Sequence, residues 1–373
     1  MKKIKVTHII SDSNIGGAGK LLVSLCSALG EKFENTVFIP KGAALSKPLS
    51  ATSAKIYEVP MAKDRSFYAG DVQGFFSVFK ELKTHIVHTH GALSARLGAR
   101  LAGVPICLST RHCAIPENKI EKKSILQRKI YNYCTDLTIS TAKYATNNLI
   151  SEGIDDGKIT TIENGVAPLK HISREEKTAL LRELKIPEGS IVLGSCARLE
   201  KVKGQDLMLT ALHTLLKKRD DVYLLLVGEG SAEDEYKRLC SRLGIADNVR
   251  FLGFLPDPSP FQNIFTVNLN ASRGTETSCL ATSECMSLGI PTVASNFGGN
   301  SEMVFPYVNG LLFRSDDCFA LISALSRIIN DETLRKKLSS GAQKLYEKYF
   351  SLSRMAADYD NIYRKLYSET VKQ

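Results

Sequence analysis

The chain of 373 residues contains no tryptophan and lacks the long apolar runs of a membrane-spanning protein. No uninterrupted stretch approaches the roughly 20 apolar residues that cross a bilayer as a helix. Lysines interrupt the first apolar stretch, Met1-Lys2-Lys3-Ile4-Lys5-Val6, which favours a first strand over a secretory signal. The sequence therefore predicts a cytoplasmic protein.

Several patterns of metal and cofactor sites are also missing. The nine cysteines are odd in number, no two have C-x-x-C spacing, and most lie in apolar segments, as free thiols do in a reducing compartment. The strict G-x-G-x-x-G dinucleotide pattern and the Walker lysine loop are absent. We expect neither a metal site nor an organic cofactor.

What is present is the composition of a globular protein, with 43% hydrophobic and 24% charged residues and enough length for two domains. The net charge of +10 lies almost wholly in the first half: residues 1–170 hold 23 basic and 14 acidic residues, which leaves 26 and 25 for the rest. A basic half indicates that one domain faces an anionic partner, either nucleic acid or an anionic lipid surface.

Short β-rich runs alternate with amphipathic helical patterns in both halves, which predicts parallel sheets covered by helices. In the first half the expected strands are 3–10, 36–39, 55–59, 86–90, 106–110, 137–140 and 159–162. The alternation breaks near Pro168 and restarts with expected strands at 191–196, 222–227, 249–252, 266–269 and 291–295. We therefore expect two doubly wound Rossmann-like domains, residues 1–168 and 169–352.

The last forty residues have a helical pattern throughout. Apolar residues recur at helical spacing from Met355 to Leu366 and form a stripe that needs a surface to cover. We expect residues 353–373 to return to the first domain as a helix.

A glycine turn, Gly16-Gly17-Ala18-Gly19, follows the first expected strand. Glycines let a backbone approach a ligand closely, and a helix N-terminus favours an anion. A turn that merely connects strand to helix explains this pattern equally well.

The second domain repeats the arrangement with charge added. Arg198 and Lys203 follow its first strand, where they could grip phosphate. Gly228 and Gly230 follow the next strand and again permit close backbone approach. The alternative is that Arg198 and Lys203 are solvated loop charges.

Two glutamates, Glu276 and Glu284, are separated by seven residues. We expect Glu276 on the loop before a helix at 278–288 and Glu284 about two turns inside that helix. Carboxylates at two points could bind the hydroxyls of an elongated sugar ligand.

Taken together, these motifs resemble the retaining glycosyltransferases of family 4, which have the GT-B fold with two Rossmann-like domains facing across a cleft. The matching pieces, in order, are Gly16-Gly17-Ala18, Val87-His88-Thr89-His90, Ser109-Thr110-Arg111-His112, Ile162-Glu163-Asn164-Gly165-Val166, Ala197-Arg198-Leu199 with Lys203-Gly204, Val227-Gly228-Glu229-Gly230, Glu276 through Glu284, Gly289-Ile290-Pro291-Thr292-Val293-Ala294-Ser295, and Gly298-Gly299 with Glu302. They cover residues 16–302, and the helical ending also fits.

The resemblance implies that Arg198 and Lys203 hold the donor diphosphate in place of a divalent metal. Glu284 would bind the ribose hydroxyls of the nucleotide. Gly16 and Gly17 would bring backbone N–H groups to the phosphate and the reacting centre.

The same resemblance implies that Glu276, with the amides of Thr277 and Ser278, holds the donor sugar, and that His112 reaches this sugar from the first domain. Members of the family often have glycine after the first motif glutamate, where this chain has Thr277, so the preferred donor sugar stays open. Arg273, just before the motif, fits an ordinary surface charge better than an anion contact.

The activity implied is hexosyl transfer, with retention, from a nucleotide diphosphate sugar to a glycan or lipid-linked saccharide in bacterial surface polysaccharide synthesis. We take UDP as the donor nucleotide, since it is the commonest one. The alternatives are another GT-B enzyme, such as an epimerase or a phosphorylase, and a nucleic-acid-binding protein. The last is disfavoured because no aromatic-rich basic groove or nucleic-acid motif is present.

Two further features have competing explanations. His85, His88 and His90 suggest a metal site, and His88 and His90 share one face of the expected strand, but no third ligand follows at a fixed spacing. Packed or site-lining side chains therefore explain these histidines better than a metal does. The segment 117–130 mixes bases with isoleucine and leucine. It is either a solvated face or a peripheral contact with an anionic membrane.

Overall fold

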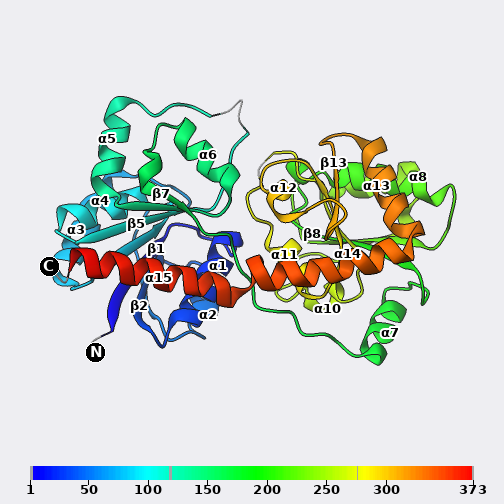
Figure 1. Ribbon diagram of the computed structural model, residues 1–373, viewed down its shortest axis with the longest axis horizontal. Coiled ribbons are helices and arrows are strands. Elements are labelled where there is room, and N and C mark those ends of the chain that lie inside the picture. Colours follow the sequence, from blue (N-terminus) through cyan, green and yellow to red (C-terminus); the bar gives the residue numbers. More distant parts are fainter. Residues whose placement is uncertain (1–2, 117–119, 275, 372–373) are drawn as a thin grey trace. The chain divides into compact units, whose positions relative to one another are not determined.

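A computed structural model describes residues 3–116, 120–274 and 276–371. The chain forms two compact units, which we treat separately (Figure 1). Unit 1 comprises Met1–Ala167 with Leu352–Gln373, and unit 2 comprises Pro168–Ser351.

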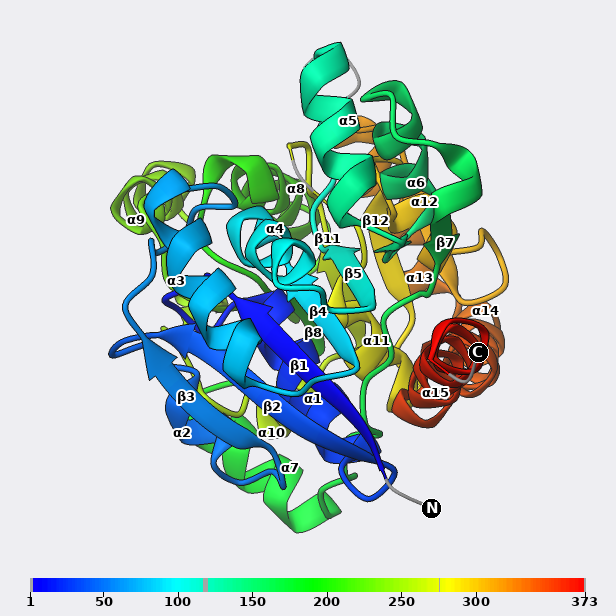
Figure 2. The same ribbon diagram turned by 90° about the vertical axis from the view of Figure 1, so that its left-hand side faces the viewer.

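Unit 1 is built on a parallel sheet of seven strands in the order β3-β2-β1-β4-β5-β6-β7 (Figure 2). The strands are β1 (Ile4–Ile10), β2 (Phe33–Pro40), β3 (Lys55–Val59), β4 (Ile86–His90), β5 (Ile106–Arg111), β6 (Leu137–Ser140) and β7 (Ile159–Thr161). The order reverses beside β1, because the chain moves outward through β2 and β3 and then returns to place β4 on the other side of β1. Ligands of open α/β sheets bind at the carboxyl ends of the strands beside such a reversal.

Helices cover both faces of this sheet. They are α1 (Gly17–Leu29), α2 (Ser46–Leu49), α3 (Ala69–Glu81), α4 (Leu93–Leu101), α5 (Ile125–Cys134), α6 (Lys143–Ser151) and α15 (Leu352–Thr370). Alternate residues of a strand point to opposite faces. Val6 and Ile86 accordingly pack with α1 and α15, whereas Ile9 and Val87 pack with α3 and α4.

The C-terminal helix α15 belongs to unit 1, as the apolar stripe predicted. Met355, Tyr359 and Tyr363 are buried in the same core cluster as residues of α1 and β1. The expectation of an unbroken helical ending was wrong. A π-helical turn, Tyr346–Phe350, ends at Ser351, which has extended backbone angles, and α15 begins after it.

Unit 2 has a parallel sheet of six strands in the order β10-β9-β8-β11-β12-β13, with the same reversal, here beside β8. The strands are β8 (Ile191–Cys196), β9 (Val222–Val227), β10 (Val249–Phe251), β11 (Val267–Asn270), β12 (Thr292–Ser295) and β13 (Gly310–Phe313). The edge strand β13 was not predicted, because its four residues follow an irregular apolar stretch that has no alternating pattern.

The helices of unit 2 also lie on both faces of the sheet. They are α7 (Arg174–Glu183), α8 (Gln205–Leu216), α9 (Glu233–Leu243), α10 (Ser259–Gln262), α11 (Leu280–Ser287), α12 (Asn300–Met303), α13 (Cys318–Asn330) and α14 (Glu332–Leu345). Residues of α8, α9 and α13 share one core with Leu193 and Leu224, while α11 packs on the opposite face with Val192 and Leu225. Strands that are apolar on both sides are typical of a parallel sheet.

The Tyr363→Phe substitution tests how α15 is held on unit 1. The Tyr363 hydroxyl lies 2.6 Å from Nδ1 of His88, and both side chains are fully buried. Removal of the hydroxyl leaves a buried ring nitrogen without this partner, so we expect a loss of about 1–3 kcal/mol in the free energy of unfolding. Urea titration followed by circular dichroism measures it.

The matched control is Tyr359→Phe on the same helix face. The Tyr359 hydroxyl lies 3.5 Å from Oγ1 of Thr110, at the limit of a hydrogen bond. We expect this variant to lose clearly less stability than Tyr363→Phe. Equal losses would mean that the contact with His88 adds nothing specific to the attachment of α15.

Candidate active site

The carboxyl end of β8 carries the first two charged residues predicted for the donor site. Arg198 is exposed two residues after β8, and Lys203 is half-buried at the end of a 3₁₀ turn, Lys201–Lys203. The buried Gln205 holds this loop by donating from Nε2 to the carbonyl oxygen of Arg198 at 2.9 Å. Gly204 has φ +69, and a Cβ there would lie 2.3 Å from the carbonyl oxygen of Ala271, so only glycine fits.

Glu276 follows the neighbouring strand β11 and is only 9% exposed. Its Oε2 accepts hydrogen bonds from Lys203 Nζ at 2.9 Å, Ser272 Oγ at 2.7 Å and Asn270 Nδ2 at 3.3 Å. Because β8 and β11 are adjacent at the reversal of the sheet, the two sequence motifs converge there. The Lys203–Glu276 ion pair is the contact that joins them.

Glu284 lies on α11 and is half-buried. Its Oε2 accepts a hydrogen bond from Nε2 of the fully buried Gln262 at 2.9 Å. Glu276 lies on a loop, as predicted, but the predicted depth of Glu284 in its helix was wrong, because α11 begins only at Leu280. Glu284 is therefore about one turn inside the helix.

A second glycine turn closes over the loop that carries Glu276. The N–H of Gly299 donates to the carbonyl oxygen of Glu276 at 3.2 Å, and a Cβ at Gly299 would lie 1.5 Å from the carbonyl oxygen of Thr277. Thr277 is buried, and the buried Oγ of Ser278 has no hydrogen-bond partner within the described residues. The loop thus carries a buried polar atom without a hydrogen-bond partner in the described part of the chain, two residues after the candidate sugar-binding carboxylate.

Gly228 and Gly230 have a reason to be glycine that involves no ligand. A Cβ at Gly228 would lie 2.2 Å from the carbonyl oxygen of Ala197, and one at Gly230 would lie 2.2 Å from that of Leu199. These glycines let the loop after β9 pack against the loop after β8. They pack against the loop that carries Arg198, and a direct contact with the donor remains a prediction.

Arg273 is not a free anion contact. Its guanidinium pairs with Asp206 and with Asp316, the latter at 2.9 Å, and its Nε donates to the carbonyl oxygen of Lys201 at 2.9 Å. The two carboxylates raise the pKa of Arg273. Arg273 therefore fastens the loop after β11 to the start of α8.

In unit 1, Gly16 and Gly17 differ from the glycines of unit 2. Both are exposed, and a Cβ at either position would meet no atom within 4 Å. Gly16 precedes α1, whose first turn has no side-chain cap. Neither packing nor backbone angle requires glycine at Gly16 or Gly17. Both positions are therefore compatible with close approach of a ligand to the backbone.

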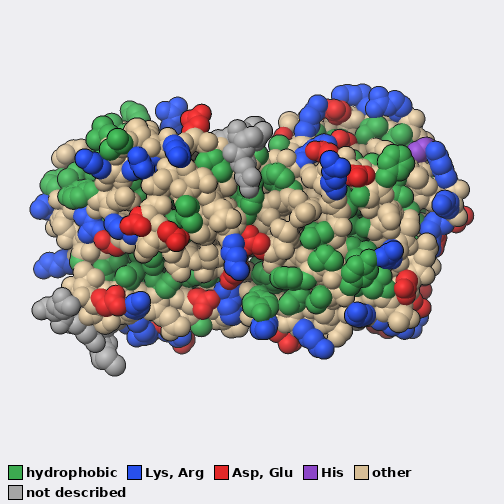
Figure 3. Space-filling model, turned by 45° about the horizontal axis from the view of Figure 1, so that its top comes forward, with side chains coloured by type: hydrophobic (Ala, Val, Ile, Leu, Met, Phe, Trp, Pro, Cys, Tyr) green, Lys and Arg blue, Asp and Glu red, His purple; other side chains and the backbone are tan. Residues whose placement is uncertain are grey.

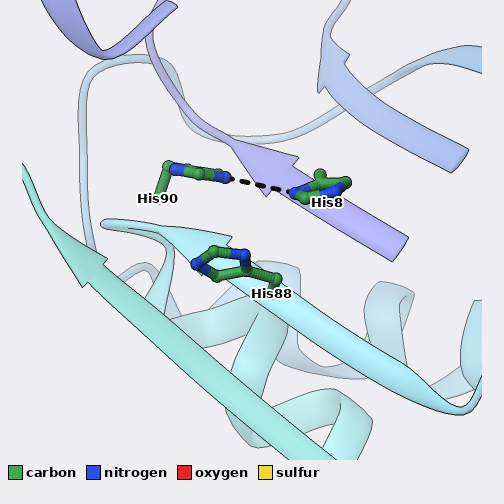
Figure 4. A group of neighbouring side chains, drawn as sticks. All are labelled: His8, His88 and His90. Carbon is green, nitrogen blue, oxygen red and sulfur yellow. Dashed lines mark hydrogen bonds between the residues drawn. The ribbon is translucent and has the colours of Figure 1, made fainter. Parts of the chain in front are cut away.

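His112 follows β5 and contacts a cluster of histidines. The sequence pattern indicated His88 and His90 of this cluster but not His8. Its Nε2 is 2.8 Å from Nδ1 of His90, and Nε2 of His90 is 3.3 Å from Nδ1 of His8 (Figure 4). His85, by contrast, lies apart, with its Nδ1 accepting from the backbone N–H of Lys5. His8 was missed because its neighbour in the sheet, His88, is 80 residues away in the chain.

His8, His88 and His90 are the one group of three potential metal ligands within the described residues. Both nitrogens of His88 and of His90 are already engaged: His88 contacts the hydroxyls of Tyr363 and Thr110 at 2.6 Å each, and His90 contacts a histidine on each side. Metal binding would have to break these hydrogen bonds, and no carboxylate belongs to the group. The contacts account for the cluster as a packed hydrogen-bond network.

Burial keeps the cluster neutral. Removal from water lowers the pKa of His8 and of His112 to about 4, and it lowers the pKa values of His88 and His90 well below 6.5. Neighbouring imidazoles lower the last two further, and Arg96 also lowers the pKa of His88. Each ring therefore carries a single N–H at neutral pH.

These lowered pKa values predict an acid-sensitive unit 1. Below pH 6.5 the histidines bind protons in the unfolded chain but stay neutral in the folded one. The free energy of unfolding therefore has its full value above pH 6.5 and declines as the pH falls toward 4. Each histidine contributes a slope of up to about 1.4 kcal/mol per pH unit in this window. Urea unfolding between pH 7.5 and 5 measures it.

The His8→Gln variant should flatten this dependence by about the contribution of one histidine. His171→Gln, on an exposed side chain of unit 2, is the control and should leave the unfolding of unit 1 unchanged. A parent protein whose unit 1 is equally stable at pH 7.5 and pH 5 would contradict the neutral cluster.

Comparison with known families matches most of the chain. The family described as "Glycosyltransferase Family 4" matches residues 15–168, and "Glycosyl transferases group 1" matches residues 176–345. The chain is 28% identical over 227 residues to the O-antigen biosynthesis glycosyltransferase WclY of Escherichia coli. That match covers 61% of this chain and 58% of the relative.

A second relative is matched over more of its length. This is the UDP-Gal:alpha-D-GlcNAc-diphosphoundecaprenol alpha-1,3-galactosyltransferase of Escherichia coli, 25% identical over 354 residues, with 89% of each chain covered.

Among solved structures, Anabaena Alr3699/HepE in complex with UDP has a TM-score of 0.85 at 20% identity, over 97% of this chain and 100% of that one. A glycosyltransferase from Rickettsia africae ESF-5 also has a TM-score of 0.85, at 19% identity, over 98% and 99% of the two chains. At this identity the structures show a shared fold. Together with the two family matches, they show that this chain is a glycosyltransferase of family 4, group 1, with the GT-B fold.

Proposed function

We propose that this glycosyltransferase takes a hexose from a UDP-sugar and transfers it, with retention of configuration, to a lipid-linked saccharide or other glycan precursor of a bacterial surface polysaccharide. The observation that carries the proposal is the ion pair of Lys203 with Glu276 at the reversal of the sheet in unit 2, where Arg198 follows the same strand as Lys203. Basic residues after one strand and a held carboxylate after the next match a ligand that joins a diphosphate to a sugar.

In this proposal Arg198 and Lys203 bind the donor diphosphate. Arg198 is exposed at a strand end, where its planar group can form two parallel hydrogen bonds to phosphate. Lys203 neutralises the charge that develops on the leaving diphosphate, in the role that a divalent metal plays in other transferases. The reaction then requires no metal ion.

The two glutamates take the hydroxyl groups of the donor. Glu276 binds the transferred sugar, assisted by the amides of Thr277 and Ser278, and Glu284 binds the ribose. Three donors hold Oε2 of Glu276 in place, so the carboxylate is oriented before the ligand arrives. The unsatisfied Oγ of Ser278 is a further group for a sugar hydroxyl.

Unit 1 contributes Gly16, Gly17 and His112. The open glycine turn before α1 presents backbone N–H groups to phosphate and the reacting centre, and His112 contacts the transferred sugar. The bond between the anomeric carbon and the diphosphate oxygen breaks, a bond to the acceptor oxygen forms on the same face of the sugar, and the proton of the acceptor hydroxyl passes to the leaving diphosphate.

The choice of UDP and of a lipid-linked acceptor follows the named relatives. Alr3699/HepE was solved with UDP and with UDP-glucose, and the matched Escherichia coli galactosyltransferase is named for UDP-Gal and a diphosphoundecaprenol acceptor. WclY is named for O-antigen biosynthesis.

Donor binding is tested with a panel of UDP-, GDP- and ADP-sugars, by calorimetry and by release of nucleoside diphosphate. We expect one UDP-sugar to bind and turn over, with or without chelator. Lys203→Ala and Glu284→Ala should each weaken donor binding by about 10- to 100-fold, the value of a lost charge-assisted hydrogen bond. Nucleoside diphosphate release that rises when acceptor is added separates a transferase from an epimerase.

Lys201→Ala is the matched control. Lys201 lies two residues before Lys203 and is 70% exposed in an ion pair with Glu235. We expect its loss to leave donor affinity within about threefold, since an exposed pair contributes little. If Lys203→Ala binds the donor as well as Lys201→Ala does, the assignment of the diphosphate site is wrong.

We also propose that unit 1 docks on an anionic membrane through the start of α5. Ile125 and Leu126 are 66% and 67% exposed, and a capping box from Ser124 to Gln127 fixes the first turn that carries them. Lys122 and Lys129 are exposed nearby, and Figure 3 shows hydrophobic and basic side chains mixed on the surface of unit 1. Residues 117–119 of the predicted basic stretch lie outside the described residues.

Such a surface can bind lipid without a membrane-spanning segment. None of the described helices is long and apolar enough to cross a bilayer. Insertion of two large apolar side chains contributes about 1.5–3 kcal/mol for each one buried. Each lysine near an anionic surface adds about 1 kcal/mol, which salt screens. This contact would place the enzyme at the cytoplasmic face of the membrane, beside lipid-linked acceptors.

Sedimentation with liposomes tests the membrane contact. The parent protein should pellet with anionic vesicles at low salt and remain in the supernatant with neutral vesicles or at high salt. The double variant Ile125→Ser with Leu126→Ser should lose about tenfold or more in partitioning. Phe319→Ser, at an 86% exposed position in unit 2, is the control. A parent protein that stays in the supernatant with anionic vesicles at low salt would refute the contact.

A further inference from the structure

A chain of three imidazoles runs from the middle of the unit 1 sheet to His112 at its carboxyl edge. His8 on β1 contacts His90 at the end of β4, and His90 contacts His112 after β5. The N···N distances are 3.3 Å and 2.8 Å. His8 and His90 are 1% and 3% exposed, so the chain is closed to water behind His112.

His90 is the central member, because it uses both ring nitrogens. Its Nδ1 contacts His112 and its Nε2 contacts His8. A neutral imidazole has one N–H donor and one lone-pair acceptor, so His90 must donate to one neighbour and accept from the other. The hydrogen bonds of the chain therefore all point in one direction, and the proton on one ring determines the tautomer of the next.

The neighbours of His90 on all sides favour the neutral form. The titratable groups around it are His8 from β1, His88 from β4 and His112 from the loop after β5, and each of them lowers the pKa of His90. Beyond them, Arg96 lowers the pKa of His88. For each of the four histidines, burial is the largest cause of the lowered pKa.

A second set of contacts fixes the ring plane of His90. The ring of His88 packs 4.6 Å from that of His90, centroid to centroid, and His90 stacks on His112 at 5.1 Å. His88 is itself held at both nitrogens, by Tyr363 of α15 and by Thr110 of β5, at 2.6 Å each. The ring of His90 is thus held in one orientation, with each ring nitrogen facing one histidine.

We propose that His90, backed by His8, is a positioning residue that locks the imidazole of His112 in one tautomer and one orientation. The inference rests on the proposed contact of His112 with the transferred sugar. With Nε2 of His112 committed to His90, the character of Nδ1, donor or acceptor, is fixed before substrate binds. The sugar hydroxyl then meets a preorganised partner and no tautomer has to change during transfer.

The decisive variant is His90→Phe, because phenylalanine keeps the stacked ring and removes both nitrogens. We expect kcat to fall by about 10- to 100-fold, the cost of a misoriented catalytic group, while the KM for donor and the affinity for UDP change by less than about threefold. His90→Gln, whose amide can donate and accept, should retain more of kcat than His90→Phe does. His85→Phe is the control, since His85 lies outside the imidazole chain.

The parent protein provides an independent readout by ¹⁵N NMR of labelled histidines, with His112→Asn used to assign the signal. We expect the ¹⁵N shifts of His112 to show a single neutral tautomer in the parent and a mixture in His90→Phe. This holds even if the variant is inactive, and if the variant does not fold, the parent spectrum alone decides. Averaged tautomers of His112 in the parent would overturn the proposal.

The two proposals fail in different ways. A parent protein that neither binds nor turns over a nucleotide sugar refutes the proposed function and leaves the NMR result on His112 intact. An active parent, together with a folded His90→Phe variant of parental kcat, refutes the positioning role and leaves the donor site intact.

Discussion

In a parallel sheet all strands end at one edge, and that constraint organises both halves of this protein. Each sheet reverses its order beside its first strand, so the loops after that strand and after its new neighbour diverge to opposite faces and leave a place for a ligand. In unit 2 this constraint brings Lys203, after β8, to Glu276, after β11, although 72 residues separate them in the chain. In unit 1 it aligns β1 with β4 and so unites His8 with His90.

Glycine serves two different purposes at these edges, and the motif pattern does not distinguish them. Gly204, Gly228 and Gly299 are required by the protein itself, because a Cβ would collide with the backbone of an adjacent loop. Gly16 and Gly17 face open space, where a side chain would collide with nothing in the chain. Close backbone packing explains the first group, whereas nothing in the packing of the described residues of unit 1 requires glycine in the second.

Burial and hydrogen bonding give the polar groups opposite characters in the two units. The carboxylate of Glu276 pairs with a lysine and accepts hydrogen bonds from two neutral donors, which offsets the cost of burying it. Desolvation keeps the clustered histidines of unit 1 neutral. In unit 2, by contrast, an ion pair joins the two motifs of the candidate site.

The sequence by itself determined the alternation of strands and helices, the doubly wound class, the return of the last helix, and the convergence of basic and acidic motifs at strand ends. These features follow from local periodicity and from the geometry of parallel sheets. Only the tertiary structure decided that Arg273 is bound by Asp206 and Asp316, that α11 begins at Leu280, and that His8 completes the histidine chain. The ion pairs of Arg273 and the contact of His8 depend on residues distant in the chain, and the start of α11 depends on tertiary packing. A local sequence pattern contains neither kind of information.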